Sequence, residues 1–303
     1  MVIFDHPHTN YGEVHFMALL DTTAIEIESI SKTFGGRCAL RRVGFQVAPG
    51  EMVALIGPSG SGKSTLLKHI SGLTPADRGS GAIRIFGRAV QQRGVIAPDV
   101  RAIRSQVGFI FQQFNLVGRL PLLTNVMTGM LAEIGTLRSL LGWFRRHERE
   151  RALAALHCVG LSEYADQRAS TLSGGQQQRA AIARAIEQRA RIILADEPIA
   201  SLDPESARLV MACLTALNRR DGLTVLISLH QVQFAFQYCP RTIALNKGEI
   251  VYDGSSAELS PAMLRAIYGT KASQLNLDGT APLDFEGYAP AMGCESGLAA
   301  VGV

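Results

Sequence analysis

The chain is poor in cysteine, in aromatic residues and in long apolar runs. Only 6% of its 303 residues are aromatic, with a single tryptophan. No apolar run approaches the ~20 residues that a membrane-spanning helix needs, and the N-terminus lacks the basic cluster and apolar core of a signal peptide. We therefore expect a soluble, cytoplasmic protein. The cysteines are five in number, an odd count, and never form a CxxC pair, which is typical neither of a disulfide framework nor of a zinc site and suits a reducing compartment.

The charge balance is also unremarkable. Lysine and arginine total 30 against 26 acidic residues, a formal net charge of +4, and 47% of the residues are hydrophobic. That hydrophobic content excludes disorder for most of the chain. The positive charge is not gathered in one long run, so the sequence does not predict a nucleic-acid partner.

Strand-like and helix-like segments alternate, which predicts an α/β fold with an added antiparallel edge. Short segments of alternating polarity indicate an antiparallel sheet; they cover residues 25–30, 43–47 and 83–86. Continuous apolar segments indicate buried parallel strands; they cover residues 52–56, 108–111, 191–195 and 224–228. Apolar residues at helical spacing predict helices after Pro204 and over 147–159.

The two ends differ from this central part. Residues 1–22 have no clear period, and we expect a disordered leader. Met17 stands just before the first predicted strand, and we hypothesise that translation starts there. Residues 269–303 become rich in glycine and alanine, which predicts a loose tail. The folded domain should then cover residues 23–268.

The strongest motif is GPSGSGKS at residues 57–64, which fits the phosphate-binding pattern GxxxxGK[ST]. It follows a predicted strand and opens a predicted helix over 64–71. Glycines let backbone N–H groups surround phosphates, the helix N-terminus favours negative charge, the lysine reaches the β- and γ-phosphates, and the last serine suits Mg²⁺. The sequence therefore predicts a nucleoside triphosphate, bound by Gly57, Pro58, Ser59, Gly60, Ser61, Gly62, Lys63, Ser64 and Thr65.

Two further motifs accompany this P-loop. The apolar strand at 192–195 ends in Asp196 and Glu197, which we expect beside the Mg²⁺ and as general base toward water, respectively. Leu172 is followed by Ser-Gly-Gly-Gln ahead of a predicted helix, a second cradle for an anion. Because one site rarely needs two cradles from one chain, a site shared between two subunits is expected. The second cradle comprises Ser173, Gly174, Gly175 and Gln176.

At these residues the sequence resembles the ATP-binding subunit of an ABC transporter, over about residues 24–260. The resemblance implies a P-loop NTPase core with an antiparallel β subdomain and a helical signature subdomain at about 113–180. It also implies that Gln112 contacts Mg²⁺, that Asp203 belongs to the D-loop and that His230 contacts the γ-phosphate. Phe34 matches an aromatic that stacks on adenine, although its ring could instead pack beneath residues 43–47.

The resemblance further implies a homodimer that holds two ATP molecules between the P-loop of one chain and residues 173–175 of the other. Glu197, His230 and Gln112 would be catalytic, and Ser64, Gln112 and Asp196 would bind Mg²⁺. Such an ATP hydrolase works with integral membrane permease subunits and an external substrate-binding protein. Its place is the cytoplasmic side of the inner membrane, as a peripheral protein.

Four segments, 112–120, 138–144, 228–232 with 238–241, and 198–203, look like those of the phosphonate importers. Phosphite, a phosphate ester or a polar amino acid remain alternative cargoes. A non-transport ABC ATPase is less favoured, because the chain has one P-loop and no heptad coiled coil. The resemblance places the coupling helix of the permease against residues 113–145.

Within that region, one group of apolar residues has two interpretations: it either faces the permease or closes a small core of the helical subdomain. Nearby arginines either form a solvated face with interleaved glutamates or lie near anionic headgroups. The apolar group is Leu137, Leu140, Leu141, Trp143 and Phe144.

Overall fold

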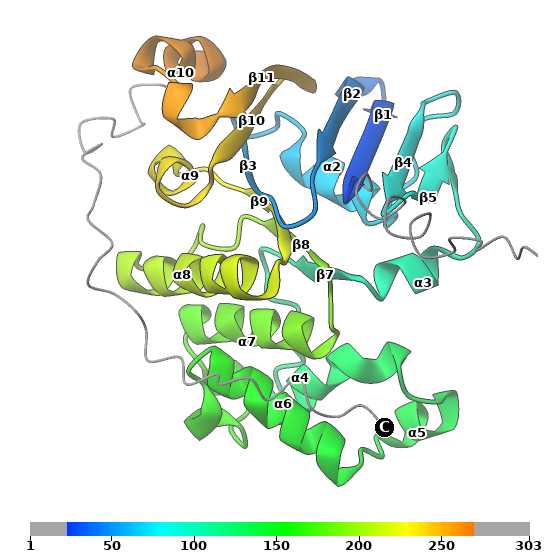
Figure 1. The fold of residues 1–303 in the computed structure, drawn as a ribbon, viewed down its shortest axis with the longest axis vertical. Helices are drawn as coiled ribbons and strands as arrows, with labels where there is room; N and C mark the ends of the chain where they lie inside the picture. Colours follow the sequence, from blue (N-terminus) through cyan, green and yellow to red (C-terminus); the bar gives the residue numbers. More distant parts are fainter. Residues whose placement is uncertain (1–22, 270–303) are drawn as a thin grey trace, which may run out of the picture.

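The computed structural model describes residues 23–269, so the expected leader and nearly all of the expected tail lie outside the described residues. Its centre is a sheet in the order β11-β10-β3-β9-β8-β7, parallel except for β11 at one edge (Figure 1). The strands of this sheet are β3 (Met52–Ile56), β7 (Val107–Ile110), β8 (Ile192–Asp196), β9 (Thr224–Ser228), β10 (Arg241–Asn246) and β11 (Glu249–Ser255).

The parallel strands are buried on both faces, as their continuous apolar sequences predict. Every residue of β3, β8 and β9 is buried. Along β3 the side chains alternate between two cores, with Ala54 in one and Val53 and Leu55 in the other. The predicted strands at 52–56 and 224–228 are confirmed, and those at 108–111 and 191–195 are displaced by one residue. The predicted α/β fold is confirmed.

A second, antiparallel sheet has the order β2-β1-β4-β5-β6. Its first two strands form a hairpin longer than expected, in which Phe34 pairs with Arg37 across the turn. Both turn glycines have positive φ, 50° at Gly35 and 81° at Gly36, which glycine adopts without steric cost. The strands are β1 (Ile25–Phe34), β2 (Arg37–Val47), β4 (Ala82–Ile85), β5 (Arg88–Gln92) and β6 (Val95–Ile96).

Helices cover the parallel sheet and connect it to the second sheet (Figure 1). The apolar stripe predicted after Pro204 is confirmed, because its five positions from Ala207 to Leu217 are buried. None of the described helices is long and apolar enough to cross a membrane. These helices are α2 (Lys63–Ile70), α3 (Val100–Arg104), α8 (Pro204–Asp221), α9 (Val232–Tyr238), η4 (Ser256–Glu258) and α10 (Pro261–Tyr268).

The remaining helices form the lower part of the molecule in Figure 1. The apolar residues at 137–144 were expected either to face the permease or to close a core of the helical subdomain. Of these, Phe144 packs against the core, whereas Trp143 is exposed. The interpretation that Trp143 closes the subdomain's own core is therefore wrong. The helices are α4 (Leu122–Met127), η1 (Thr128–Ala132), α5 (Thr136–Leu141), α6 (Arg146–Cys158), η2 (Ser162–Tyr164), η3 (Ala169–Thr171) and α7 (Gly174–Glu187).

Candidate functional site

The P-loop connects β3 to α2 with glycines at positions where a side chain does not fit. Gly57 has φ 144°, and a Cβ there would lie 2.0 Å from the Leu245 carbonyl oxygen. Gly62 has φ 109°, and its Cβ would lie 2.5 Å from the Ala39 oxygen. Ser59 and Gly60 are exposed at the crest of the loop. The backbone around α2's N-terminus is therefore open toward an anion, as the motif predicts.

Lys63 curls back over this loop. Its Nζ donates to the Gly57 oxygen at 2.7 Å and to the Pro58 oxygen at 3.3 Å. Burial lowers the pKa of Lys63, while the nearby Glu197 and Asp196 carboxylates raise it. An ammonium with only carbonyl partners on the loop is well placed to meet phosphate oxygens.

One polar atom of the loop, the Ser61 hydroxyl oxygen, fits the phosphates of a nucleotide. The Ser61 Oγ is buried and makes no hydrogen bond within the described residues, and a buried hydroxyl without a partner is costly. A phosphate oxygen would supply that partner. Thr65, also predicted at the nucleotide, follows in the first turn of α2, where its carbonyl bonds His69 Nδ1 at 2.7 Å.

A tyrosine that lies outside every sequence motif forms a hydrogen bond with the P-loop. The Tyr268 hydroxyl, at the end of α10, accepts a hydrogen bond from the Gly57 N–H at 3.0 Å. Burial raises the pKa of Tyr268 to about 12. Residue 268 lies far from the P-loop in sequence, so no local pattern could have predicted this contact.

Asp196 lies directly beside the start of α2. Ser64 Oγ donates to Asp196 Oδ1 at 2.8 Å, and Ser228 Oγ donates to the same oxygen at 3.0 Å. The Glu197 N–H donates to Ser228 Oγ at 2.8 Å. Ser228 was missed by the sequence analysis, and its only signal is its place as the last residue of β9. Because β8 and β9 are parallel neighbours with Asp196 opposite Ser228, the two meet at one sheet edge.

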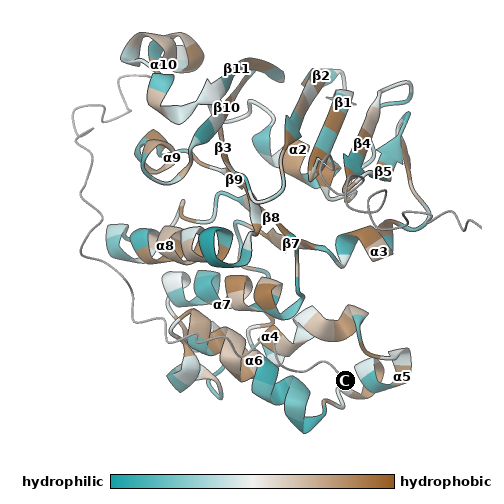
Figure 2. Ribbon diagram, in the orientation of Figure 1, coloured by the Kyte–Doolittle hydropathy of each residue, from teal (hydrophilic) through white to brown (hydrophobic). Residues whose placement is uncertain are grey.

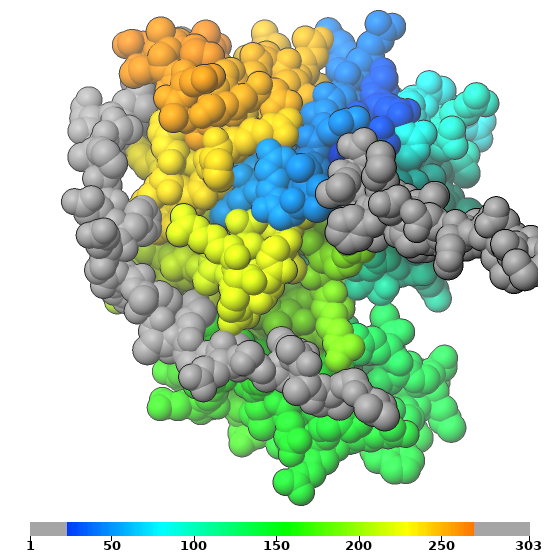
Figure 3. Space-filling view, in the orientation of Figure 1, coloured from blue at the N-terminus to red at the C-terminus, as the bar shows by residue number. Residues whose placement is uncertain are grey.

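Glu197 and His230 form an ion pair at the same edge. His230 Nε2 lies 2.5 Å from Glu197 Oε1. Glu197 has φ 50°, in the left-handed region. The hydrogen bond from His230 lowers the pKa of Glu197, against the opposing effect of burial. The structure thus brings together Lys63, Ser64, Asp196, Glu197 and His230, as predicted (Figure 3 shows the light-blue P-loop region adjoining the yellow-green segment after β8).

A magnesium ion fits this arrangement, since a hydroxyl and a carboxylate oxygen already lie together at Ser64 and Asp196. Mg²⁺ takes one or two such ligands and completes its shell with water and substrate phosphates. Within residues 23–269 no group of three or more His, Cys, Asp or Glu side chains could hold a metal. The ion is therefore expected only together with a phosphate ligand.

Gln112, the third predicted magnesium contact, is exposed two residues past β7. The loop after it has left-handed backbone at Phe114 (φ 55°) and Asn115 (φ 49°). Arg184 on α7 donates to the Asn115 oxygen at 2.7 Å and to the Phe114 oxygen at 3.4 Å. Arg184, also missed from sequence, therefore fastens the loop that follows Gln112 to α7.

The second cradle sits at the start of α7. Ser173 is the N-cap: its Oγ accepts from the Gln176 N–H at 3.3 Å, and its N–H donates to Gln176 Oε1 at 2.9 Å. A Cβ on Gly175 would lie 2.5 Å from Ser206 Oγ, so only glycine allows α8 this close. Ser173 is exposed. In the described part of the chain no hydrogen bond or ion pair joins Ser173–Gln176 to the P-loop.

Phe34 and Asp203 complete the set of predicted residues. Phe34 is 50% exposed at the hairpin tip, so the interpretation that its ring packs beneath residues 43–47 is wrong. Lys32 Nζ lies 5.1 Å from the centre of that ring. Asp203 is the N-cap of α8, where its carboxylate accepts from the Ser206 N–H at 2.9 Å and its pKa is lowered by that bond.

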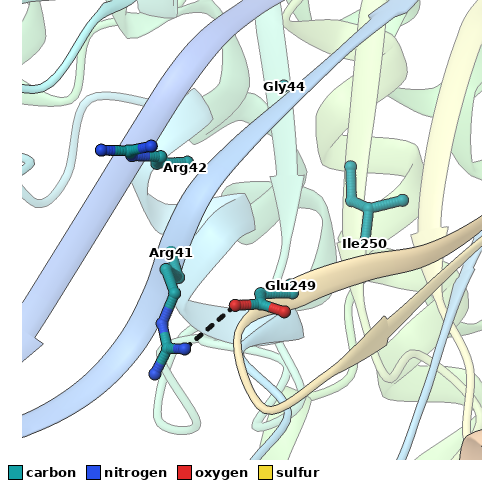
Figure 4. Close-up of a pocket in the computed structure, with 5 residues that line it drawn as sticks. All are labelled: Arg41, Arg42, Gly44, Glu249 and Ile250. Atoms are coloured by element: carbon teal, nitrogen blue, oxygen red, sulfur yellow. Dashed lines mark ion pairs between the residues drawn. The ribbon is translucent and has the colours of Figure 1, made fainter.

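A hollow between β2 and β11 is separate from these residues. Arg41, Arg42, Gly44, Glu249 and Ile250 line it, and Arg41 pairs with Glu249 at 3.1 Å across it (Figure 4). Both Arg41 and Arg42 are exposed to solvent, and Arg41 is already paired with Glu249. The hollow therefore lacks the features of a phosphate cradle.

Comparison with known proteins agrees with this geometry. The family described as ABC transporter matches residues 40–200. The chain is 59% identical to the phosphonates import ATP-binding protein PhnC of Cupriavidus pinatubonensis (strain JMP 134), over 84% of this chain and 91% of that protein. It is 60% identical to the protein of the same name from Paraburkholderia xenovorans (strain LB400), over 83% of this chain and 84% of that protein.

Solved structures of ATP-binding cassettes share the fold. The dimeric cassette MJ0796 is 34% identical with a TM-score of 0.67, covering 77% of this chain and 98% of that one. The ADP conformation of the cassette MJ1267 is 26% identical with a TM-score of 0.69, covering 84% and 98%. With the two cradles, the strand-end carboxylates and the histidine in place, the chain belongs to the ATP-binding proteins of the ABC transporter family.

Proposed function

We propose that this chain is the ATP-hydrolysing subunit of an importer for phosphonates. The observation that supports hydrolysis most directly is the Glu197–His230 pair, placed next to the Ser64–Asp196 contact at the P-loop. A carboxylate held in its ionised form beside a magnesium-phosphate site is suited to take a proton from water. Two relatives at 59% and 60% identity are phosphonates import ATP-binding proteins, which supports the phosphonate cargo.

Each predicted residue near the P-loop has a separate role in the proposed hydrolysis. Lys63 and the N–H groups at α2's N-terminus bind and orient the phosphates, and Ser61 Oγ gains its missing partner there. Ser64, Asp196 and Gln112 would hold Mg²⁺, which neutralises charge on the β- and γ-phosphates when bound. Glu197 accepts a proton from the attacking water at Oε1 or Oε2. His230, freed from Glu197, donates to the γ-phosphate.

A homodimer would complete each site. Ser173, the first residue of the second cradle, is exposed, and a cassette of the same fold forms a dimer. In the proposed dimer, Ser173, Gly174, Gly175 and Gln176 of one subunit face the γ-phosphate on the other, with Asp203 at the dimer contact. Phe34 would stack on adenine from its exposed position. Residues 23–268 would form this ATP-binding domain, with its helical part at about 113–180.

The cargo itself would pass through other proteins. We expect integral membrane permease subunits against the loop after Gln112, an external substrate-binding protein, and a peripheral position on the cytoplasmic side of the inner membrane. The Arg184 bonds to Phe114 and Asn115 connect that loop to the helix of the second cradle, so a permease bound at the loop could act on the nucleotide site.

Growth on defined phosphorus sources tests both parts of the proposal. A strain lacking this chain is supplied with phosphate, phosphite, a phosphate ester or an alkylphosphonate alone, and is complemented by wild type or Glu197→Gln. Growth lost only on phosphonate, restored by wild type and not by the variant, is the expected result. Loss of growth on another phosphorus source would assign a different cargo and leave the proposed ATPase role unchanged. Restoration by Glu197→Gln would contradict the role of ATP hydrolysis.

A further inference from the structure

The most exposed apolar surface of the described residues belongs to α5 and the turn after it. Four side chains form it, and we call them the α5 patch: Leu137, Leu140, Leu141 and Trp143, which are 72%, 80%, 67% and 67% exposed. No residue of α5 is buried. Figure 2 places α5 at the lower edge of the helical region, away from both sheets. Large apolar side chains gathered this way on a surface usually mark an interaction site.

The patch is held outward by specific contacts. Leu137, Leu140 and Leu141 have the spacing of one helix face, and α5 ends at Gly142, with φ 60°. On the same helix, Arg138 donates to Glu148 Oε2 at 2.6 Å and to the Trp143 carbonyl oxygen at 3.1 Å. The Glu148 carboxylate is nearly buried and also accepts from the Arg145 N–H at 2.6 Å. These bonds fix α5 against the start of α6 and leave its apolar face free.

Positive charge flanks the patch at the start of α6. Arg145, Arg146 and Arg149 are all exposed. Glu148 is paired with Arg138, Glu150 pairs with Arg146 at 2.8 Å, and Asp166 lies 3.8 Å from Arg149. Among the described residues, Arg145 is then the arginine of this group with no ion pair. The exposed surface next to the leucines and the tryptophan therefore carries a net positive charge.

We propose that the α5 patch binds directly to an anionic lipid bilayer, with its leucines and Trp143 among the headgroups and Arg145 against the lipid phosphates. Leucine and tryptophan beside exposed arginine is the composition of protein segments that lie in a membrane interface. The charge of the flank complements an anionic surface. The bilayer contact is independent of the proposed cargo and rests on the proposed function only in placing a membrane nearby.

Trp143 is the only tryptophan of the chain, so its fluorescence reports on the patch alone. The full chain, without permease, is mixed with vesicles of phosphatidylcholine alone or with vesicles that also contain anionic phosphatidylglycerol, and flotation is measured in parallel. We expect a blue shift and flotation only with the anionic vesicles, both weakened by salt. An unchanged spectrum without flotation overturns the proposal. So does an emission that is already blue without lipid, since another part of the chain then covers the patch.

Matched variants separate the patch from the rest of the surface. Leu140→Ser should weaken binding roughly tenfold, whereas Val95→Ser, on exposed β6, should not. Arg145→Gln should weaken it about fivefold, whereas Arg101→Gln, on exposed α3, should not. Equal losses in the control variants contradict the proposal. A blue shift produced by detergent-solubilised permease and not by lipid would assign the patch to a protein partner instead.

ATP hydrolysis by the same preparations keeps this inference distinct from the proposed function. All four variants should retain the hydrolysis rate of the wild type, because none is at the nucleotide site. Vesicle binding without hydrolysis would contradict the proposed function alone. Hydrolysis without vesicle binding would contradict the α5 patch alone.

Discussion

His230 Nε2 lies 2.5 Å from Glu197 Oε1, so the proposed base and the histidine expected at the γ-phosphate are in direct contact. The bond keeps Glu197 ionised, because it lowers the pKa of that carboxyl. It also fixes the carboxylate near Ser64 and Asp196. In the proposed mechanism both partners exchange this contact for substrate contacts before hydrolysis.

Replacing Glu197 by glutamine should remove the base and leave ATP binding intact. Loss of a general base costs about 10²–10⁴-fold in rate, so we expect a fall of that size in kcat and an ATP-bound dimer that persists in gel filtration. Glu205→Gln, at an exposed position in the first turn of α8, serves as control. Near-normal turnover of Glu197→Gln would show that another residue is the general base.

Removing the histidine should change the pH dependence of the reaction. In His230→Ala the bond that lowers the Glu197 pKa is absent, so the pKa should rise toward its ordinary value. The acidic limb of kcat/KM, which follows ionisation of the base in the free enzyme, where this bond is present, then moves to higher pH, together with a lower maximum. An acidic limb at the wild-type position would show that Glu197 does not determine it.

Lys63→Ala should weaken ATP binding. Its ammonium is the buried cation over the P-loop, held by Gly57 and Pro58 oxygens, and hydrogen bonds to charged groups are worth ~1.5–3 kcal/mol. We expect a Kd at least tenfold higher, measured with a fluorescent nucleotide. Lys68→Ala, exposed on the same helix, is the matched control and should bind as the wild type does.

Lys32 should affect the KM for ATP more than kcat. Its Nζ lies 5.1 Å from the centre of the Phe34 ring and donates to the Pro75 oxygen at 2.8 Å, so the ammonium fixes one side of the proposed adenine stack. Cation–π contacts of this kind are worth ~0.5–1 kcal/mol, which predicts a KM two- to fivefold higher in Lys32→Met. Lys32→Arg should restore it. A fall in kcat at constant KM would argue against the stacking role.

Glu187 should make the protein less stable as the pH rises. Burial raises the pKa of this carboxyl from 4.5 to about 7, despite bonds to Arg151 at 2.8–2.9 Å. Between those values the unfolded chain releases a proton that the folded chain keeps, so the free energy of unfolding falls with rising pH, by at most about 3 kcal/mol.

Urea unfolding of Glu187→Gln at pH 5 and pH 8 measures this effect. From pH 5 to pH 8, the free energy of unfolding should fall less in the variant than in the wild type. Glu150→Gln, at an exposed position of α6, should behave as the wild type. The prediction is contradicted when the free energy of unfolding of the wild type rises from pH 5 to pH 8 and that of Glu187→Gln does not.

Sequence alone predicted the residues that lie in continuous motifs and strands. The segment from Met52 to Ser64 could be assigned because a buried strand, a glycine loop and a helix follow one another along the chain. Ser228, Tyr268 and Arg184 could not, because each acts through a partner distant in sequence. The exposure of Trp143 was also beyond prediction, since apolar residues at helical spacing are typical of cores as well as of surfaces.

The left-handed backbone at Glu197, described above, determines which faces the two acidic residues present. In an extended strand, consecutive side chains point to opposite faces of the sheet. With extended backbone throughout, the carboxylates of Asp196 and Glu197 would therefore lie on opposite faces of the sheet. The φ of 50° ends that alternation at Glu197. Branched side chains are strongly disfavoured there, and replacements such as valine or isoleucine would disturb the direction of the chain as well as its chemistry. The placement of the proposed metal ligand beside the proposed base therefore depends on one backbone torsion.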